Sequence, residues 1–135
     1  MISMTWFYKD RPVEDDDIKD QIGFVYVIEN LSTGKKYIGK KLFKFTRTKT
    51  VKGKRKKVKV DSDWQTYYGS NNELNSDVEK LGKESFRRSI LHLCKSKGTA
   101  NFLEAKEQIL NNVLESDNWY NDQIRVRVHR SHIKL

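Results

Sequence analysis

The chain has 135 residues, which is enough for one compact domain but leaves two separate cores each near the size where folding becomes marginal. Hydrophobic residues make up 36% and aromatic residues 11%, too much for a disordered tail. We therefore expect a single folded domain over residues 1–135 that carries a net charge of +9.

Composition also excludes several classes of protein. The chain has no run of about 18 apolar residues and no basic-then-apolar leader, so we expect a cytoplasmic protein without membrane attachment. Cys94 is the only cysteine, which excludes an internal disulfide framework and a zinc site built on several thiolates. The histidines at 92, 129 and 132 lack a metal-ligand spacing and are interpreted as ordinary surface or strand residues.

The first predicted element is a β-hairpin. Residues 1–21 are interpreted as an N-terminal extension, in which the acidic run Glu14–Asp17 is a solvated linker or a helix start. Residues 23–30 (G-F-V-Y-V-I-E-N) are rich in aromatic and β-branched side chains, and L-S-T-G-K separates them from K-Y-I-G-K-K at 36–41. Two such runs around a glycine-containing loop predict paired antiparallel strands.

A cationic segment follows the hairpin. The window Lys35–Val60 holds thirteen Lys or Arg and no acid, so the other 109 residues carry a net charge of −4. We interpret residues 44–63 as a basic arm, a loop or hairpin that presents charge to nucleic acid rather than a solvated charge run or a dock for an acidic protein. The cations expected to contact the nucleic acid are Lys40, Lys44, Lys52, Lys54, Arg55, Lys56, Lys57 and Lys59.

Two helices and two more strands complete the prediction. Asn71 or Asn72 is suited to cap a helix that Gly82 ends, and residues 86–94 read as a third strand. A second helix is predicted to start at Thr99 or Asn101. Its apolar stripe consists of Phe102, Leu103, Ile109, Leu110, Val113 and Leu114.

The last predicted element is a half-buried strand over residues 124–128, where Ile and Val alternate with Arg. Together these elements predict an α/β (α+β) fold. It consists of a small, mainly antiparallel three-stranded sheet flanked by helices, with a basic loop insertion and an extra strand at the C-terminal end.

The hairpin carries F-V-Y at 24–26 and Y-I-G at 37–39, which puts two tyrosines eleven residues apart on adjacent strands. With Y-Y-G-S at 67–70, K-L-G-K-E-S-F-R-R-S-I-L at 80–91 and W-Y-N at 119–121, this series resembles the GIY-YIG nucleases, particularly the small phage-encoded endonucleases. The resemblance extends from Gly23 to Asn121. Phe24 departs from it, because the name motif has glycine there.

The resemblance implies a metal-dependent DNA endonuclease that hydrolyses phosphodiester bonds, with Mg²⁺ or Mn²⁺ as cofactor. Tyr26 would activate the attacking water, and Tyr37 would orient the water or assist its activation. A phenol has a reference pKa of about 10. We expect Lys40, Lys41, Arg47 and the metal ion to lower that pKa toward the useful range.

The resemblance also implies an arginine about ten residues after the second tyrosine, and Arg47 stands ten after Tyr37. Its guanidinium would stabilise the transition state at the scissile phosphate. Arg47 also lies at the entrance to the basic arm, where it would be one DNA-contacting cation among many. Lys41 is the alternative, because it shares strand parity with Tyr37.

The implied metal ligand is a glutamate on the second helix. Glu104 matches the resemblance, whereas the helical wheel puts Glu107 nearer the apolar stripe, so both stay candidates and Glu104 is preferred. A single carboxylate leaves most coordination positions to water and phosphate, which suits Mg²⁺. Asn121 matches a late asparagine of the family and is interpreted as structural support.

The alternative function is a non-catalytic nucleic-acid-binding protein that keeps the fold and uses the arm. Either protein would act as a monomer or a homodimer on DNA, in the host cell cytoplasm if it is phage-encoded. Homing, restriction and DNA degradation are all compatible with these residues.

Overall fold

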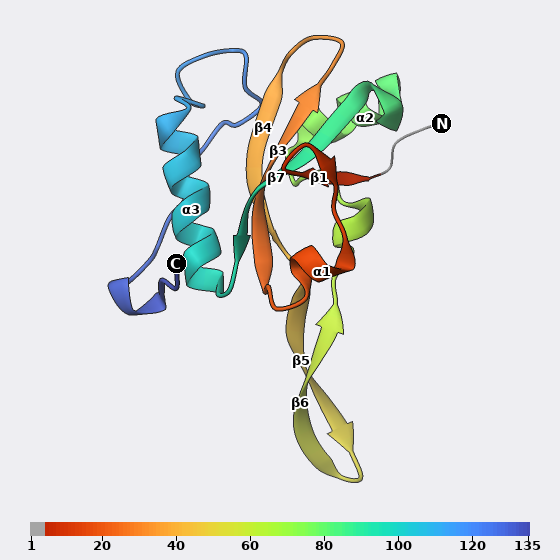
Figure 1. The fold of residues 1–135 in the computed structure, drawn as a ribbon, viewed down its shortest axis with the longest axis vertical. Helices are drawn as coiled ribbons and strands as arrows, with labels where there is room; N and C mark the ends of the chain where they lie inside the picture. The colour runs from red at the N-terminus through yellow and green to blue at the C-terminus, as the bar shows by residue number, and fades with distance from the viewer. Residues whose placement is uncertain (1–4) are drawn as a thin grey trace.

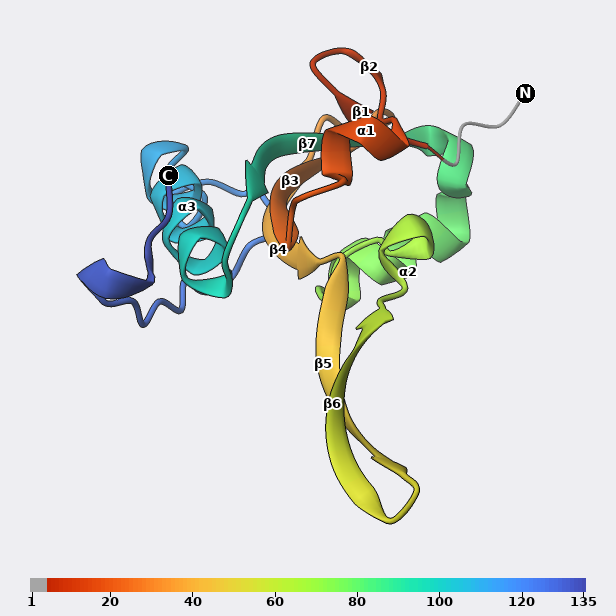
Figure 2. The same ribbon diagram turned by 60° about the horizontal axis from the view of Figure 1, so that its bottom comes forward.

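The computed structural model describes residues 5–135. A five-stranded sheet in the order β2-β1-β7-β3-β4 lies between α3 on one side and α2 on the other (Figures 1 and 2). The sheet strands are β1 (Trp6–Tyr8), β2 (Arg11–Pro12), β3 (Gly23–Asn30), β4 (Lys36–Leu42) and β7 (Phe86–Cys94). The remaining elements are α1 (Asp15–Ile18), β5 (Lys44–Val51), β6 (Lys54–Asp61), η1 (Trp64–Thr66), α2 (Asn72–Leu81), η2 (Lys83–Ser85), α3 (Lys97–Leu110) and η3 (Arg130–His132). Within the described residues, no helix is long and apolar enough to span a membrane.

The three predicted strands form the centre of the sheet. β3 pairs antiparallel with both β4 and β7, and six of its eight residues are buried because it is covered on both faces. In this register Tyr26 lies opposite Gly39 and Ile28 lies opposite Tyr37. Residues two apart on a strand share a face, so Tyr26 and Tyr37 lie on the same side of the hairpin.

The N-terminal segment widens the sheet, which corrects the prediction of three strands. β1 runs parallel to β7 and pairs antiparallel with β2. Trp6 drives this docking: its side chain is 2% exposed, and its ring meets the edges of Phe24 and Tyr26 at centroid distances of 5.0 and 5.2 Å. Aromatic burial therefore turns the expected extension into sheet. The first four residues of that extension lie outside the described part.

The sheet separates two apolar clusters. One contains Trp6, Phe24 and Tyr26, and the other contains Val25 and Ile38 beneath α3. The predicted apolar stripe is wrong at its C-terminal end, because Ile109 and Leu110 in the last turn of α3 and Leu114 beyond it are all more than half exposed. The face that meets the sheet is instead made of Thr99, Ala100, Ala105 and Gln108. Small side chains let the helix approach the strands closely. The helical wheel used for the prediction considered only large apolar side chains.

The predicted C-terminal strand is also wrong. Residues 118–121 cover the outer edge of β4, where Lys36 bonds to Asn118 and Tyr120 through backbone groups at 3.0 and 2.7 Å. The chain then leaves that edge, so residues 124–128 have no ladder partner. Alternation of apolar and charged residues predicts a strand only where a neighbouring edge is available.

The basic arm is a two-stranded ribbon that projects from the body (Figure 2). β5 and β6 pair over their full length, and Lys52 and Gly53 form the turn. A backbone hydrogen bond of 2.9 Å from Ser62 to Phe43 closes the base of the ribbon. The predicted loop is therefore ordered as a hairpin.

Candidate active site

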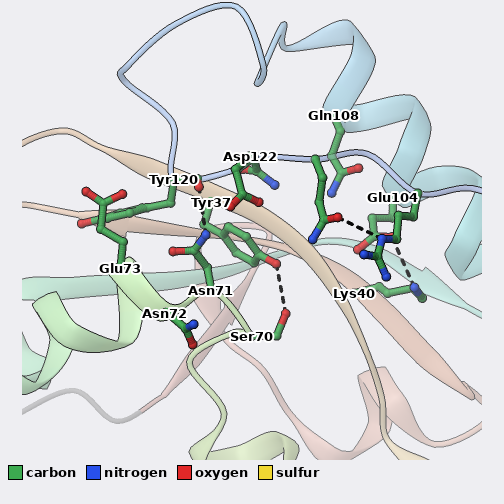
Figure 3. A pocket seen from close by; sticks show the side chains of 13 residues that line it. Tyr37, Lys40, Ser70, Asn71, Asn72, Glu73, Glu104, Gln108, Tyr120 and Asp122 are labelled. Carbon is green, nitrogen blue, oxygen red and sulfur yellow. Dashed lines mark hydrogen bonds and ion pairs between the residues drawn. The ribbon is translucent and has the colours of Figure 1, made fainter.

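A cavity at the edge of β4 gathers the candidate residues from four parts of the chain. It has an inner hollow of about 400 Å³ and an outer hollow of about 640 Å³. Tyr37, Lys40, Ser70 and Glu104 line both hollows. Figure 3 shows these four side chains in the outer hollow. The inner hollow is completed by Tyr26, Lys41, Leu42, Phe45, Ser62, Asp63 and Tyr67. The fold thus brings together both predicted tyrosines and the preferred glutamate.

The ring of Tyr26 fits against two glycines. Tyr26 is 1% exposed, and a Cβ placed on Gly39 would lie 2.5 Å from its hydroxyl oxygen. A Cβ on Gly69 would lie 3.4 Å from the same oxygen. The glycine of Y-I-G therefore leaves the space in which the Tyr26 phenol lies across the strand.

Replacing Gly39 by alanine is expected to lower the free energy of unfolding by about 1–3 kcal/mol, because the new methyl group overlaps the Tyr26 hydroxyl. The displaced phenol should also lower any activity that depends on it. Urea denaturation of the variant and the wild type measures the first effect. An unchanged midpoint would contradict the packing described here.

Tyr37 is the more accessible of the two tyrosines. Its ring centroid lies 6.2 Å from that of Tyr26, and its hydroxyl shares a 3.3 Å hydrogen bond with Ser70. Burial raises the pKa of Tyr37, an effect that the Ser70 hydrogen bond partly opposes. Burial, with Tyr67 and Tyr37 beside it, raises the pKa of Tyr26 well above its usual value. In the protein without a metal ion, desolvation is the largest cause of this raised pKa.

Arg88 fixes the segment that carries Tyr67. Its guanidinium is 2% exposed, and one nitrogen donates to the carbonyls of Gln65 and Tyr67 at 3.0 and 2.8 Å. The same guanidinium stacks on the rings of Trp6 and Tyr68. A buried cation from β7 therefore holds the wall of the cavity behind Tyr26.

Glu104 projects from α3 to the edge of β4. Its side chain is 13% exposed and pairs with the ammonium of Lys40 at 3.3 Å. Burial raises the pKa of this carboxyl group, while Lys40 acts in the opposite direction. Glu107, the alternative, does not line the cavity and instead lies 3.5 Å from His92.

The side chains of the cavity suit a hard cation that takes only some of its ligands from the protein. Among the described residues, no three His, Cys, Asp or Glu side chains converge on one point. Glu104 and Asp63 are the carboxylates of the inner hollow, and Asp63 is paired with Lys41 at 2.6 Å, so Glu104 is the carboxylate that would bind the cation. Such a site fits Mg²⁺, which keeps several waters and takes further oxygens from substrate phosphates.

The two cationic candidates occupy different places. Lys41 lines the inner hollow, where its ammonium pairs with Asp63 at 2.6 Å and lies over the ring of Tyr67. Arg47 lies on the exposed ribbon with its guanidinium 4.9 Å from the ring of Phe45, and it lines neither hollow. The structure therefore brings Lys41 to the tyrosines and keeps Arg47 at the ribbon.

Asn121 supports the wall of the outer hollow. Its amide donates to the carbonyl of Ile38 at 2.8 Å and accepts from the Ile38 amide at 3.0 Å, which satisfies the free edge of β4. Asn71 likewise ties the start of α2 to the carbonyl of Tyr120 (Figure 3). The supporting role predicted for Asn121 matches these contacts.

Sequence reasoning gave no role to Ser70 or Tyr67, although both belong to the Y-Y-G-S segment quoted for the resemblance. It also missed Arg125, which lines the outer hollow. Nothing in the spacing of the C-terminal segment indicates that Arg125 reaches this cavity.

The hairpin carries both tyrosines, and α3 brings Glu104 to the same cavity. The family described as "Putative endonuclease segE, GIY-YIG domain" matches residues 6–124, and the chain belongs to this family. No curated protein and no solved structure gives a significant match. Membership of the family makes the protein a nuclease, with DNA as its substrate.

Proposed function

We propose that the protein is a metal-dependent DNA endonuclease that hydrolyses phosphodiester bonds in the β4-edge cavity. The observation that carries the proposal is the shared lining of one hollow by Tyr26, Tyr37 and Glu104. These residues are far apart in the chain, and a packing role alone would not require a largely covered carboxylate beside two phenols.

Tyr26 and Tyr37 act on the attacking water. Tyr37 orients the water through its hydroxyl, which Ser70 holds in place. Tyr26 takes up the proton that the water loses as its oxygen bonds to phosphorus and the bond to the leaving oxygen breaks. Since burial raises the pKa of Tyr26, its phenolate fraction grows with pH, and the cleavage rate should rise from pH 7 to 9.

Glu104 holds the divalent cation, Mg²⁺ or Mn²⁺. The bound ion supplies electrostatic stabilisation to the developing charge on phosphate oxygens. Lys40 pairs with Glu104 at 3.3 Å in the free protein, and its ammonium would be available to a substrate phosphate if a cation took its place on Glu104. Lys41, beside the tyrosines, is the cation proposed to favour proton loss from them.

The ribbon binds the DNA backbone and aligns the duplex with the cavity. Arg47 belongs to this surface, and its stacking on Phe45 brings it next to the inner hollow, where it contacts a phosphate near the one that is cut. Phosphate contacts of this kind set affinity more than sequence preference.

The Y-I-G-K-K and Y-Y-G-S segments favour a phage-type enzyme that homes or degrades DNA, acting in the cytoplasm of the host. One hydrolytic site cuts one strand, so a double-strand break requires a homodimer on DNA or two encounters of a monomer.

Incubation of the purified protein with supercoiled plasmid tests the function. We expect nicking that needs Mg²⁺ or Mn²⁺, stops with EDTA, rises with pH, and falls at least about 10²-fold in Tyr26→Phe, which lacks the proton acceptor. DNA binding without cleavage under any of these ions would instead establish the non-catalytic alternative. Equal cutting by wild type and variant would show that a contaminant is responsible.

A further inference from the structure

The outer hollow contains an arginine that neither the tyrosine motifs nor the ribbon accounts for. Arg125 lies on the C-terminal segment after α3, yet it lines the cavity together with Tyr37, Lys40 and Glu104. The helix, the hairpin and this segment thus contribute to one surface, although Arg125 is 21 residues from the nearest of these partners.

The backbone on either side of Arg125 is anchored. Asn121 is 7% exposed and bonded to Ile38, and Ile124 packs against the apolar cluster beneath α3. Further along, the backbone amide of Lys134 donates a hydrogen bond of 2.6 Å to the hydroxyl of Thr99. The segment is therefore fixed on both sides, and Arg125 has a defined position at the rim.

One hydrogen bond orients the guanidinium of Arg125 and leaves the N–H groups of its two terminal nitrogens available to a ligand. Its Nε donates to the side-chain oxygen of Gln123 at 2.9 Å. Among residues 5–135 no carboxylate lies within ion-pair distance of Arg125, whereas Lys40 in the same hollow is already paired with Glu104. The two terminal nitrogens can therefore form the forked contact that a phosphate group takes from arginine.

We propose that Arg125 binds the scissile phosphate and stabilises the negative charge that builds on it in the transition state, a role that rests on the nuclease function proposed above. The contrast with Arg47 supports the choice. Arg47 lies on the ribbon and stacks on Phe45, outside both hollows, whereas Arg125 shares the outer hollow with Glu104 and Tyr37. Arg47 then contributes to DNA affinity, and Arg125 to the rate of the chemical step.

Single-turnover cleavage at saturating DNA tests this assignment. Arg125→Ala should slow cleavage by about 10²-fold, as expected for loss of one preorganised transition-state donor, with a change in Kd of less than about threefold. Arg125→Lys keeps the positive charge but cannot form the two-point contact of a guanidinium with phosphate, so it should recover only part of the rate. Arg47→Ala should act mainly on binding and raise Kd more than Arg125→Ala does.

Arg127→Ala is the matched control, since it removes the same charge from the same segment at a residue that does not line the cavity. Equal rates for Arg125→Ala and Arg127→Ala, or a loss confined to Kd, would overturn the proposal for Arg125 alone. A wild-type protein that binds DNA but never cuts it would overturn both this proposal and the nuclease mechanism. Thermal unfolding of each variant checks that the anchored segment is retained.

Discussion

Glu104→Gln is expected to lower the single-turnover cleavage rate by at least about 10³-fold. The substitution keeps the shape of the side chain but removes the carboxylate that would hold the divalent cation. A bound cation contributes several kcal/mol of transition-state stabilisation, and about 4 kcal/mol corresponds to three orders of magnitude in rate. Rates measured with Mg²⁺ at saturating DNA give the comparison, and the DNA affinity in EDTA should stay close to that of the wild type.

The same variant should be slightly more stable than the wild type at neutral pH. Burial raises the folded-state pKa of Glu104 above its unfolded value, so ionisation of this group favours the unfolded chain. The wild type therefore has its full stability from this group at low pH and loses it as the pH rises through the raised pKa. Glutamine avoids that loss, and the difference in Tm between the two proteins should vanish near pH 4.

Glu107→Gln is the matched control, because Glu107 lies one turn along the same helix and contacts His92 instead of the cavity. Its cleavage rate should equal that of the wild type. If Glu107→Gln were inactive and Glu104→Gln active, the metal ligand would be the other glutamate. If both variants cut normally, no carboxylate of α3 would take part in the reaction.

Excision of the ribbon is expected to weaken DNA binding by at least about 10²-fold in 0.1 M salt while leaving the body folded. The hydrogen bond between Ser62 and Phe43 already closes its base, so a Gly-Gly link can replace residues 44–61. An isolated two-stranded ribbon adds little stability. The Tm should therefore change by no more than about 4 °C, roughly 1 kcal/mol for a chain of this size.

The reason for the lost affinity is the uncompensated charge of the ribbon. All of its nine lysines and arginines are exposed, and within the described residues only Lys44 has an acidic partner, Asp61 at 3.9 Å. Lys49 even lies directly opposite Lys56, an arrangement that destabilises the hairpin. Such a surface is explained by binding to phosphates, with release of condensed counterions.

Substitutions on the intact ribbon allow the release of counterions to be measured. Replacing Lys54, Lys56 and Lys57 by glutamine should reduce the slope of log K against log salt by up to about 2.7, at about 0.9 for each lost phosphate contact. Fluorescence anisotropy with a labelled duplex in EDTA gives the slope without cleavage.

The charge-matched control replaces the exposed Lys19, Lys80 and Lys106, which are not part of the ribbon. This variant has the same net charge but should keep the wild-type slope. Equal slopes for the two triple variants would mean that net charge attracts the DNA and that the ribbon makes no dedicated contact.

Local patterns predicted the centre of the fold well. The run of β-branched and aromatic residues predicted β3 and β7 with correct bounds, and Asn71 caps α2 through the Leu74 amide as expected. The prediction failed where long-range packing decides. β1 is a strand because Trp6 fills a space between aromatic rings, and the buried face of α3 is chosen by small side chains that let it lie close to the sheet.

The candidate site was predicted in the same uneven way. The tyrosine spacing and the glutamate came from ordered motifs, and the fold brings them to one hollow. The pKa of Tyr26 could not be predicted, because its direction depends on burial that only the packed structure defines. Arg125 was missed for a similar reason, since the path of the C-terminal segment follows from its anchors at Asn121 and Ile124 and not from local periodicity.

The narrow base of the ribbon separates the surface proposed to bind DNA from the cavity proposed to cut it. Because the chain returns at Ser62 to almost the point that it left at Phe43, the length and sequence of the ribbon beyond Phe45 can vary without moving the tyrosines. Hairpins of other chemistry grafted at this junction would retarget the enzyme to new stretches of duplex while the cutting machinery stays as it is.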